Sequence, residues 1–323
     1  KTLSLGNTYI MLLYTMLFSK DPRKYWLQYV ILLAVAMLCI LLFKRQDLSP
    51  YYEGFVQDRP YVFKQNTDAN DEFYAEIYDQ LQNPNERNNY VLDKTIEMTQ
   101  PTLRNSVFLD IGSKTGSFLN ILHERGFKAT GLEPSQAMVK YSQKRNPQMS
   151  LKCGSIEQPM TFDKGSYTHV ISNGLTFYEF QDKRQFFQNC QFWLTPGGYL
   201  ILHLVDPERF DPIIPGGKPA ILKSPQLYSS KRITDTMIDF IDFKYKAGFD
   251  FSDWSKNQNV RLKETFTDEL TKNVRENEFH YKMESLQEVL KMASANGFIV
   301  QGQVNLSNCT GDAHQYLVIL ERP

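Results

Sequence analysis

The residues best placed to do chemistry are an acid and two glycines in the segment VFLDIGSKTG, residues 107–116. Asp110 lies in an apolar run of β-forming residues, and Gly112 and Gly116 precede a helical pattern that begins at Ser117. An apolar strand, an acid, a glycine turn and a helix build a ligand crevice at the strand ends of an open α/β sheet. The spacing lacks the middle glycine of the dinucleotide fingerprint G-x-G-x-x-G. The segment therefore indicates a nucleoside site but does not specify one.

A second acid, Glu133, ends the next apolar segment, Lys128–Pro134. An acid about 20 residues beyond the first glycine turn can accept hydrogen bonds from ribose hydroxyls. This spacing strengthens the prediction of a nucleoside site. Because Glu133 would lie at an open strand end, we expect its removal to weaken nucleoside binding and to change folding stability little.

Alternating strands and helices are expected to position these residues. Apolar runs predict strands, and patterns with apolar residues on one face predict helices at Ser117–Arg125, Gln136–Arg145 and Glu284–Asn296. This alternation favours an α/β fold, Rossmann-like, with a mostly parallel sheet and helices on both faces. The strands expected after Val107–Ile111 are Lys128–Pro134, Met149–Ile156, Tyr167–Ser172, Tyr199–Val205, Phe298–Leu306 and His314–Leu320.

Together these segments resemble the class I S-adenosylmethionine-dependent methyltransferases. The resemblance is carried by DIGSKTG, GLEPS, CGSIEQP and LTPGGYLIL, and it extends from about residue 70 to residue 323. It implies a seven-stranded sheet whose last strand is antiparallel, and S-adenosyl-L-methionine as cofactor. In that family the glycine loop receives the methionine part, the acid holds the ribose, and the loop after the third strand borders the adenine. The cofactor-binding residues that the resemblance implies are Asp110, Gly112, Ser113, Lys114, Gly116, Glu133, Pro134, Met138, Ser155, Ile156, Asn173, Gly174 and Tyr78.

Two positions depart from the family. Lys114 stands where the family usually has glycine, and Ser155 stands where it often has an acid. We expect Lys114 to point into solvent or toward the cofactor carboxylate, without a left-handed backbone. In the alternative, its side chain fills the methionine pocket. Two functions therefore stay open: a methyltransferase, or an accessory subunit of a membrane-associated assembly that keeps the fold without the chemistry.

The methyl acceptor is expected to meet residues outside the glycine loop. The helix predicted over Asp71–Leu81 brings Tyr74 or Tyr78 to the methionine end, and Asn173 and Gly174 follow the fourth strand. The insertion 206–281 is expected to form a lid of antiparallel strands at Thr234–Tyr245, Val260–Thr267 and Lys272–Tyr281. Methyl transfer requires alignment and desolvation more than a strong base, so no catalytic residue is predicted. The candidate substrate contacts are Tyr178, Tyr245, Arg275 and His280.

The segment Tyr25–Phe43 carries no charged residue, has aromatic residues at one end and basic pairs at both ends. These features predict a transmembrane helix that anchors the chain in a lipid bilayer. We therefore expect a single-pass membrane protein whose C-terminal domain faces a reducing compartment. The expected division is an N-terminal segment 1–24, the helix 25–43, a tether 44–70 and a methyltransferase-like domain 71–323.

Composition excludes some partners. The chain of 323 residues has 36 basic and 36 acidic side chains, so no overall field recruits nucleic acid. The four cysteines are far apart and form no metal-binding pattern, so no metal is expected.

Overall fold

The computed structural model describes residues 25–46, 57–218 and 224–323, and the chain divides into two units, Lys1–Gly54 and Phe55–Pro323. The described part of the first unit is one helix, α2 (Tyr25–Gln46). Within the described ranges, no helix is both long and apolar enough to cross a membrane. The helix predicted at this position exists, but its prediction as a transmembrane anchor is not supported.

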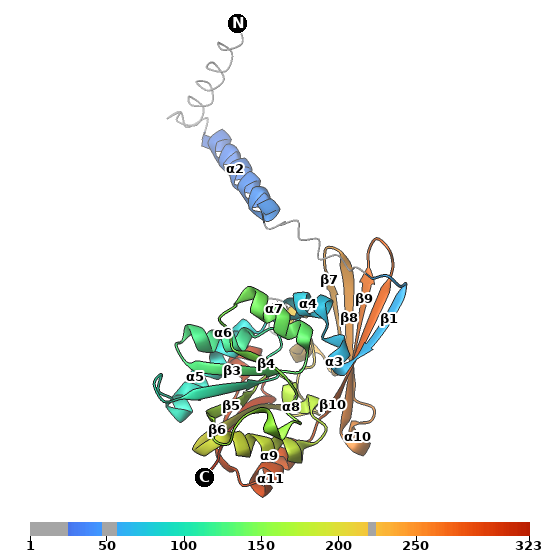
Figure 1. Cartoon of the computed structure of the whole chain (residues 1–323). Coiled ribbons are helices and arrows are strands. Elements are labelled where there is room, and N and C mark those ends of the chain that lie inside the picture. The colour runs from blue at the N-terminus through green and yellow to red at the C-terminus, as the bar shows by residue number, and fades with distance from the viewer. Residues whose placement is uncertain (1–24, 47–56, 219–223) are drawn as a thin grey trace. The chain divides into compact units, whose positions relative to one another are not determined.

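The second unit is built on a seven-stranded sheet, and the predicted Rossmann-like α/β fold is confirmed (Figure 1). Five parallel strands form most of it, and β12 pairs antiparallel with both β6 and β11. The strand order is β11 (Ile299–Asn305), β12 (Gln315–Glu321), β6 (Leu194–Val205), β5 (Tyr167–Ser172), β2 (Val107–Ile111), β3 (Lys128–Glu133) and β4 (Leu151–Cys153).

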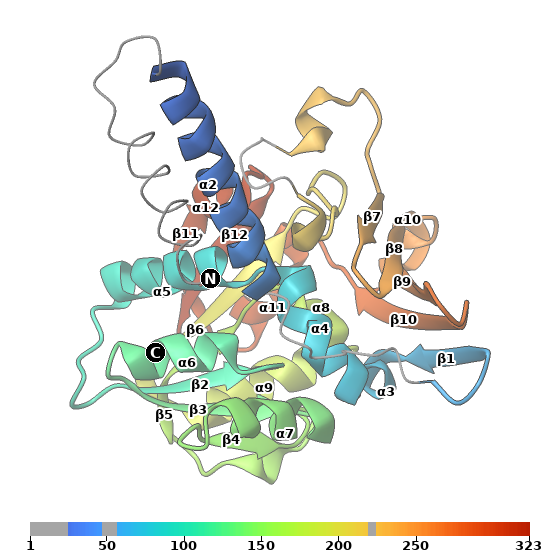
Figure 2. The ribbon, with the colours of Figure 1, turned by 90° about the horizontal axis from the view of Figure 1, so that it is seen from above.

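Helices bury both faces of this sheet (Figure 2). Phe108 and Leu109 are neighbours in β2 but belong to different hydrophobic clusters, because successive side chains of a strand point to opposite faces. One cluster includes residues of α5 and α6, and the other includes residues of α4, α8, α9 and α11. The helices around the sheet are α4 (Glu72–Gln82), α5 (Asn85–Thr99), α6 (Ser117–Glu124), α7 (Gln136–Arg145), α8 (Thr176–Glu179), α9 (Lys183–Trp193), α11 (Leu286–Ala295) and α12 (Ser307–Thr310), with 3-10 turns at Pro159–Thr161, Pro215–Gly217 and Pro225–Tyr228.

A second sheet of five strands corresponds to the predicted lid (Figure 1). The single strand predicted over Thr234–Tyr245 is wrong, because the chain turns at Phe240, whose N–H bonds to the carbonyl of Phe243 at 3.0 Å. The segment 44–70 predicted as a tether contains β1 and the short helix α3 (Asn66–Ala69). The strand order is β1 (Tyr61–Gln65), β10 (Val274–Lys282), β9 (Asn259–Asp268), β8 (Phe243–Asp250) and β7 (Asp235–Asp239), with α10 (Trp254–Asn257) between β8 and β9.

Helix α4 is joined to the lid by a buried polar group. Asp71 caps the helix by accepting the N–H of Tyr74, and the Tyr74 hydroxyl donates to Glu264 Oε1 at 3.0 Å. The Tyr245 hydroxyl donates to the same oxygen at 2.7 Å. Glu264 is completely buried, and burial raises its pKa to about 7.

This raised pKa predicts how stability depends on pH. Glu264 favours folding below its unfolded pKa of about 4.5, and this contribution is lost as pH rises toward the folded value of about 7. Glu264→Gln should therefore reduce the drop in Tm between pH 5 and pH 8. Thermal unfolding followed by circular dichroism measures the drop, and equal drops in both proteins would contradict the assignment.

Candidate functional site

A pocket of about 550 Å³ lies at the carboxyl ends of the central strands, between the seven-stranded sheet and the lid. The first sheet contributes the ends of β2, β5 and β6, where an open α/β fold places its ligands. The lid contributes apolar and aromatic walls. The residues that matter below are Tyr74 and Tyr78 of α4, Arg87 of α5, Asp110, Gly112, Ser113 and Lys114 after β2, Asn173, Gly174 and Glu179 after β5, His203 of β6, and Phe249, Leu262, Phe279 and Tyr281 of the lid.

The glycine loop has a left-handed backbone at Gly112, Lys114 and Gly116, with φ of 68°, 50° and 75°. A Cβ at Gly112 would lie 2.2 Å from Thr176 Cγ2, so only glycine lets α8 pack against the loop. Lys114 has the unfavourable backbone that glycine adopts freely. The expectation that Lys114 avoids a left-handed conformation is therefore wrong.

Two charged side chains of the pocket have buried atoms without a partner. Asp110 is 2% exposed, and no described residue hydrogen-bonds its Oδ2. Burial raises the pKa of Asp110 to about 7. Arg87 has no ion pair or hydrogen bond with any described residue, and its Nε is buried. Arg87 as a whole is half-buried, and only its Nε and the Asp110 Oδ2 are buried without a partner among the described residues. Each of these two atoms can bind a ligand group of opposite charge.

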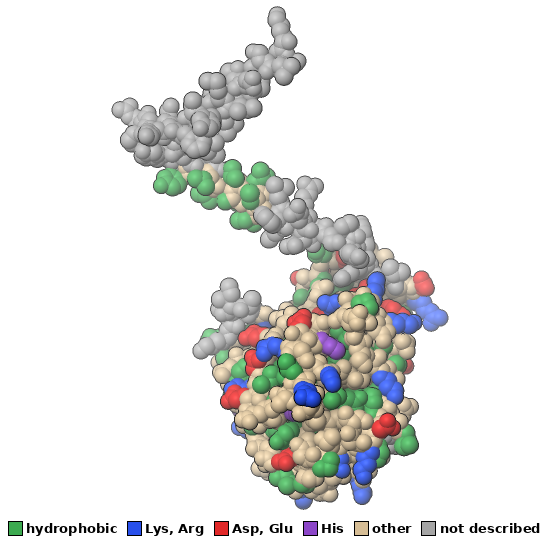
Figure 3. Space-filling model, turned by 60° about the vertical axis from the view of Figure 1, so that its left-hand side comes forward, with side chains coloured by type: hydrophobic (Ala, Val, Ile, Leu, Met, Phe, Trp, Pro, Cys, Tyr) green, Lys and Arg blue, Asp and Glu red, His purple; other side chains and the backbone are tan. Residues whose placement is uncertain are grey.

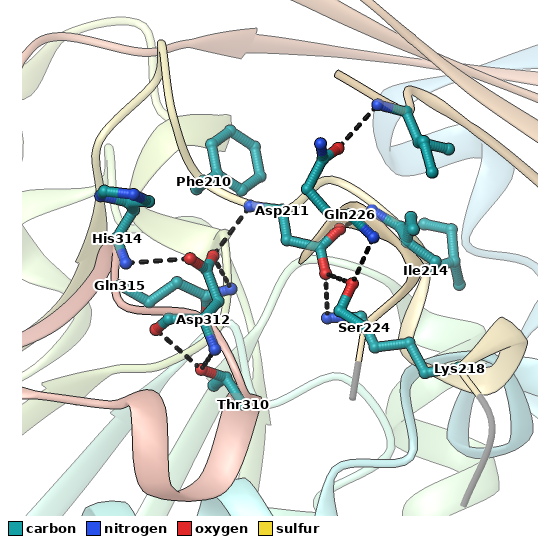
Figure 4. Close-up of polar contacts among 12 residues, drawn as sticks. Phe210, Asp211, Ile214, Lys218, Ser224, Gln226, Thr310, Asp312, His314 and Gln315 are labelled. Atoms are coloured by element: carbon teal, nitrogen blue, oxygen red, sulfur yellow. Dashed lines mark hydrogen bonds and ion pairs between the residues drawn. The ribbon is translucent and has the colours of Figure 1, made fainter. Parts of the chain in front are cut away.

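His203 has a defined tautomer. Asp312 accepts the N–H groups of Asp211 and His314 at 2.8 and 2.9 Å, and its carboxylate also accepts Gln315 Nε2 at 2.9 Å (Figure 4). Because a carboxylate only accepts, Gln315 must turn its Oε1 toward His203 Nε2, 3.0 Å away. His203 therefore holds its proton on Nε2 and leaves Nδ1, which has no partner among the described residues, as an acceptor. Burial, together with the charge of Arg87, lowers the pKa of His203 to about 3.

The other end of this network also lines the pocket. Asp211 accepts the Ser224 hydroxyl and forms an ion pair with Lys218 Nζ at 2.8 Å (Figure 4). Since Asp211 also donates its N–H to Asp312, the chain that follows β6 is tied to β12. These contacts hold together residues that line the same pocket as Arg87 and His203.

Lys114, Glu133 and Glu179 form a cluster beside the glycine loop. Glu133 has no exposed surface, and its two carboxylate oxygens accept the backbone N–H groups of Lys114 at 3.0 Å and Ser135 at 2.9 Å. Lys114 Nζ lies 2.8 Å from Glu179 Oε2. Burial alone would lower the pKa of Lys114, but Glu179 and Glu133 raise it above its ordinary value. Lys114 thus stays charged and points toward Glu179 rather than into solvent.

The predicted cofactor-binding residues fall into two groups. Those that line the pocket are Tyr78, Asp110, Gly112, Ser113, Lys114, Asn173 and Gly174. Those that do not line it are Gly116, Glu133, Pro134, Met138, Ser155 and Ile156. In the second group Glu133 belongs to the ribose part of the expected site and Ser155 and Ile156 to the adenine part, whereas Gly116 belongs to the glycine loop.

The four predicted substrate contacts do not line the pocket. Tyr178 joins α8 to β6, because its hydroxyl accepts the N–H of Val205 at 2.9 Å. Tyr245 donates to Glu264, and Arg275 forms an ion pair with Asp71 at 2.8 Å. His280 lies 2.9 Å from Glu278 and is well exposed. Phe249, Leu262, Phe279 and Tyr281 line the pocket from the lid instead.

Glu133→Ala should lower the free energy of unfolding, contrary to the expectation from sequence. The substitution leaves two buried N–H groups, those of Lys114 and Ser135, without an acceptor. An unsatisfied buried donor costs about 1–3 kcal/mol. Urea unfolding of both proteins measures the loss, and a change below about 0.5 kcal/mol would contradict the assigned contacts.

Comparison with known proteins shows which fold this domain has. Residues 109–202 match a family model described as a methyltransferase domain. A methyltransferase of Streptomyces caelestis, CcbJ, superposes with a TM-score of 0.59 at 13% identity, over 80% of this chain and 99% of that one. The domain has the methyltransferase fold. An S-adenosylmethionine-dependent methyltransferase of Clostridium acetobutylicum superposes with a TM-score of 0.58 at 15% identity, over 77% of this chain and 97% of that one. No curated protein sequence matches this chain.

The pocket residues can be compared with the chemical groups of S-adenosylmethionine to see which part of the cofactor they would bind. Its α-amino acid end carries a carboxylate and an ammonium group, which suit Arg87 Nε and Asp110 Oδ2, both buried without a partner among the described residues. Its ribose end requires an accessible acid, and Glu133 has no exposed surface. The amino acid half of the cofactor therefore fits the site as it stands, whereas the nucleoside half requires a rearrangement around Glu133.

Proposed function

We propose that the unit Phe55–Pro323 is an S-adenosylmethionine-dependent methyltransferase. The observation that carries the proposal is the presence of two buried, unpartnered atoms of opposite charge, Arg87 Nε and Asp110 Oδ2, in the pocket that the glycine turn at Gly112 also lines. The matched methyltransferase domain includes Asp110 and Gly112. The cofactor supplies an electrophilic methyl group on a positively charged sulfur.

The chain's own residues bind and orient the cofactor and exclude water from the site. Arg87 binds the carboxylate of the cofactor, and ionised Asp110 binds its ammonium group. Asn173 donates to Asn88 Oδ1 at 2.9 Å, which fixes the loop after β5. The lid side chains Phe249 and Phe279 remove water from the acceptor compartment, and this desolvation favours methyl transfer.

The acceptor is proposed to be a small molecule. The compartment beside the glycine loop is walled by Leu262 and Phe279, which are almost fully buried. These walls suit an acceptor with an apolar or aromatic body. The surface outside it carries interspersed charges of both signs on the face drawn in Figure 3.

Isothermal titration calorimetry tests the proposal without a known acceptor. S-adenosylhomocysteine contains the amino acid end, whereas 5′-methylthioadenosine lacks it. We expect the protein to bind the first more tightly than the second, because only the first reaches Arg87 and Asp110. Equal affinities, or no binding of either compound, would contradict the proposal.

A second function is favoured by one observation. Glu133 is enclosed by Lys114 and Ser135 and has no exposed surface, as expected for an accessory subunit that keeps the fold without the chemistry. In that case neither the natural chain nor a variant at Lys114 would bind the nucleoside.

A further inference from the structure

The ion pair between Lys114 and Glu179 connects two loops at the carboxyl edge of the sheet. Lys114 follows β2, and Glu179 is the last residue of α8, which follows β5. The close approach of Gly112 to Thr176 holds these two segments together. The ion pair is shielded from water, since the Lys114 side chain is 7% exposed and that of Glu179 is 29% exposed. It is therefore screened less by salt than a surface pair.

The charge of the same lysine lies close to the acid expected to bind ribose, since the Lys114 ammonium opposes the rise that burial gives the pKa of Glu133, and Glu133 together with Glu179 raises the pKa of Lys114. The backbone N–H of residue 114 also occupies Glu133 Oε2, a contact that any residue at this position keeps, while the Lys114 side chain extends toward Glu179 rather than toward solvent. Ser135 covers the other oxygen, and its hydroxyl donates to the carbonyl of Asn70. Lys114 and Glu179 line the pocket, whereas Glu133 does not. The cluster thus separates Glu133 from the compartment that contains Arg87 and Asp110.

We propose that the Lys114–Glu179 ion pair closes the nucleoside half of the cofactor site, and that ribose reaches Glu133 only when Lys114 leaves Glu179. This inference rests on the proposed function, because it takes S-adenosylmethionine as the ligand. Binding of the nucleoside must then break a shielded ion pair, which lowers its affinity. The amino acid half of the ligand binds at Arg87 and Asp110, so its affinity does not include the free energy of breaking this ion pair.

Lys114→Gly tests the inference by removing the side chain and suiting the left-handed backbone. We expect the affinities for adenosine and for S-adenosylhomocysteine to rise by roughly ten-fold or more, since about 1.4 kcal/mol corresponds to ten-fold. Glu179→Gln should raise both affinities in the same direction, because it removes the charge that holds Lys114. L-homocysteine, which has only the amino acid half, should bind equally well to all three proteins.

Lys272→Gly is the matched control. Lys272 also has a left-handed backbone, with φ of 60°, and it pairs with Glu269 at 3.2 Å on the surface of the lid. This variant should bind all three ligands as the natural chain does, and its Tm corrects for the backbone effect of replacing lysine by glycine.

The calorimetric titrations test the inference and the proposed function separately. A gain for adenosine in Lys114→Gly but not in Lys272→Gly supports the inference. Unchanged or weaker adenosine binding in Lys114→Gly overturns it, while tight binding of S-adenosylhomocysteine by the natural chain would leave the proposed function standing. If S-adenosylhomocysteine binds to none of the proteins, both the inference and the proposed function fail.

Discussion

Arg87→Leu should weaken the binding of S-adenosylhomocysteine by roughly a hundred-fold, or about 3 kcal/mol, the scale of charge-assisted hydrogen bonds to a carboxylate. Arg87 lines the pocket and has no partner among the described residues that could compete for its N–H groups. In the absence of ligand the same substitution should change Tm little, because the Arg87 side chain is half-buried and has no ion pair or hydrogen bond with a described residue. Lower affinity together with unchanged stability identifies a ligand-binding residue rather than a structural one.

Arg125→Leu is the matched control for this measurement. Arg125 pairs with Asp93 at 2.9 Å, and both side chains are largely exposed. The control should change neither the affinity nor, beyond about 0.5 kcal/mol, the free energy of unfolding. An Arg87→Leu variant that binds S-adenosylhomocysteine as tightly as the natural chain would contradict the assigned carboxylate site.

Asp110→Asn should abolish the dependence of ligand affinity on pH and reduce the affinity at pH 8. Only the ionised carboxyl group attracts the ammonium of the ligand, and the pKa of Asp110 in the free protein is about 7. The affinity of the natural chain should therefore rise by roughly ten-fold between pH 6 and pH 8, as the ionised fraction rises. Calorimetric titrations with S-adenosylhomocysteine at the two pH values give both affinities.

The stability of the same variant provides an independent readout. Asp110 favours folding below its unfolded pKa of about 3.8, and this contribution is lost as pH rises to its folded pKa of about 7. Asp110→Asn should therefore be more stable than the natural chain at pH 8 and similar to it at pH 4. Asp163→Asn, at an exposed position, should follow the natural chain at both pH values. A variant whose affinity rises with pH as steeply as that of the natural chain would refute the role of Asp110.

The central sheet could be predicted from sequence because its signals are local. Each parallel strand is a short apolar run followed by a turn, and Asp110, Gly112 and Asn173 stand where such strands end. The lid was harder to predict. The strand β1 has only five residues and pairs with β10, far away in the chain, so its own sequence does not identify its partner.

The charged residues of the site illustrate a second limit. Arg87 belongs to a polar stretch that reads as a loop, although α5 begins at Asn85, directly after Pro84. His203 looks like any residue of a buried strand, and its role depends on Gln315 and Asp312 of a distant segment. Spacing singled out Glu133 as a candidate, but its complete burial beside Lys114 depends on packing that no motif records.

A crystal structure of the protein with S-adenosylhomocysteine at pH 8 tests the central claim most directly. The account predicts the ligand carboxylate within hydrogen-bond distance of the Arg87 guanidinium and the ligand ammonium within the same distance of the Asp110 carboxylate. A ligand bound elsewhere, or bound in this pocket with its amino acid end away from both side chains, would contradict it.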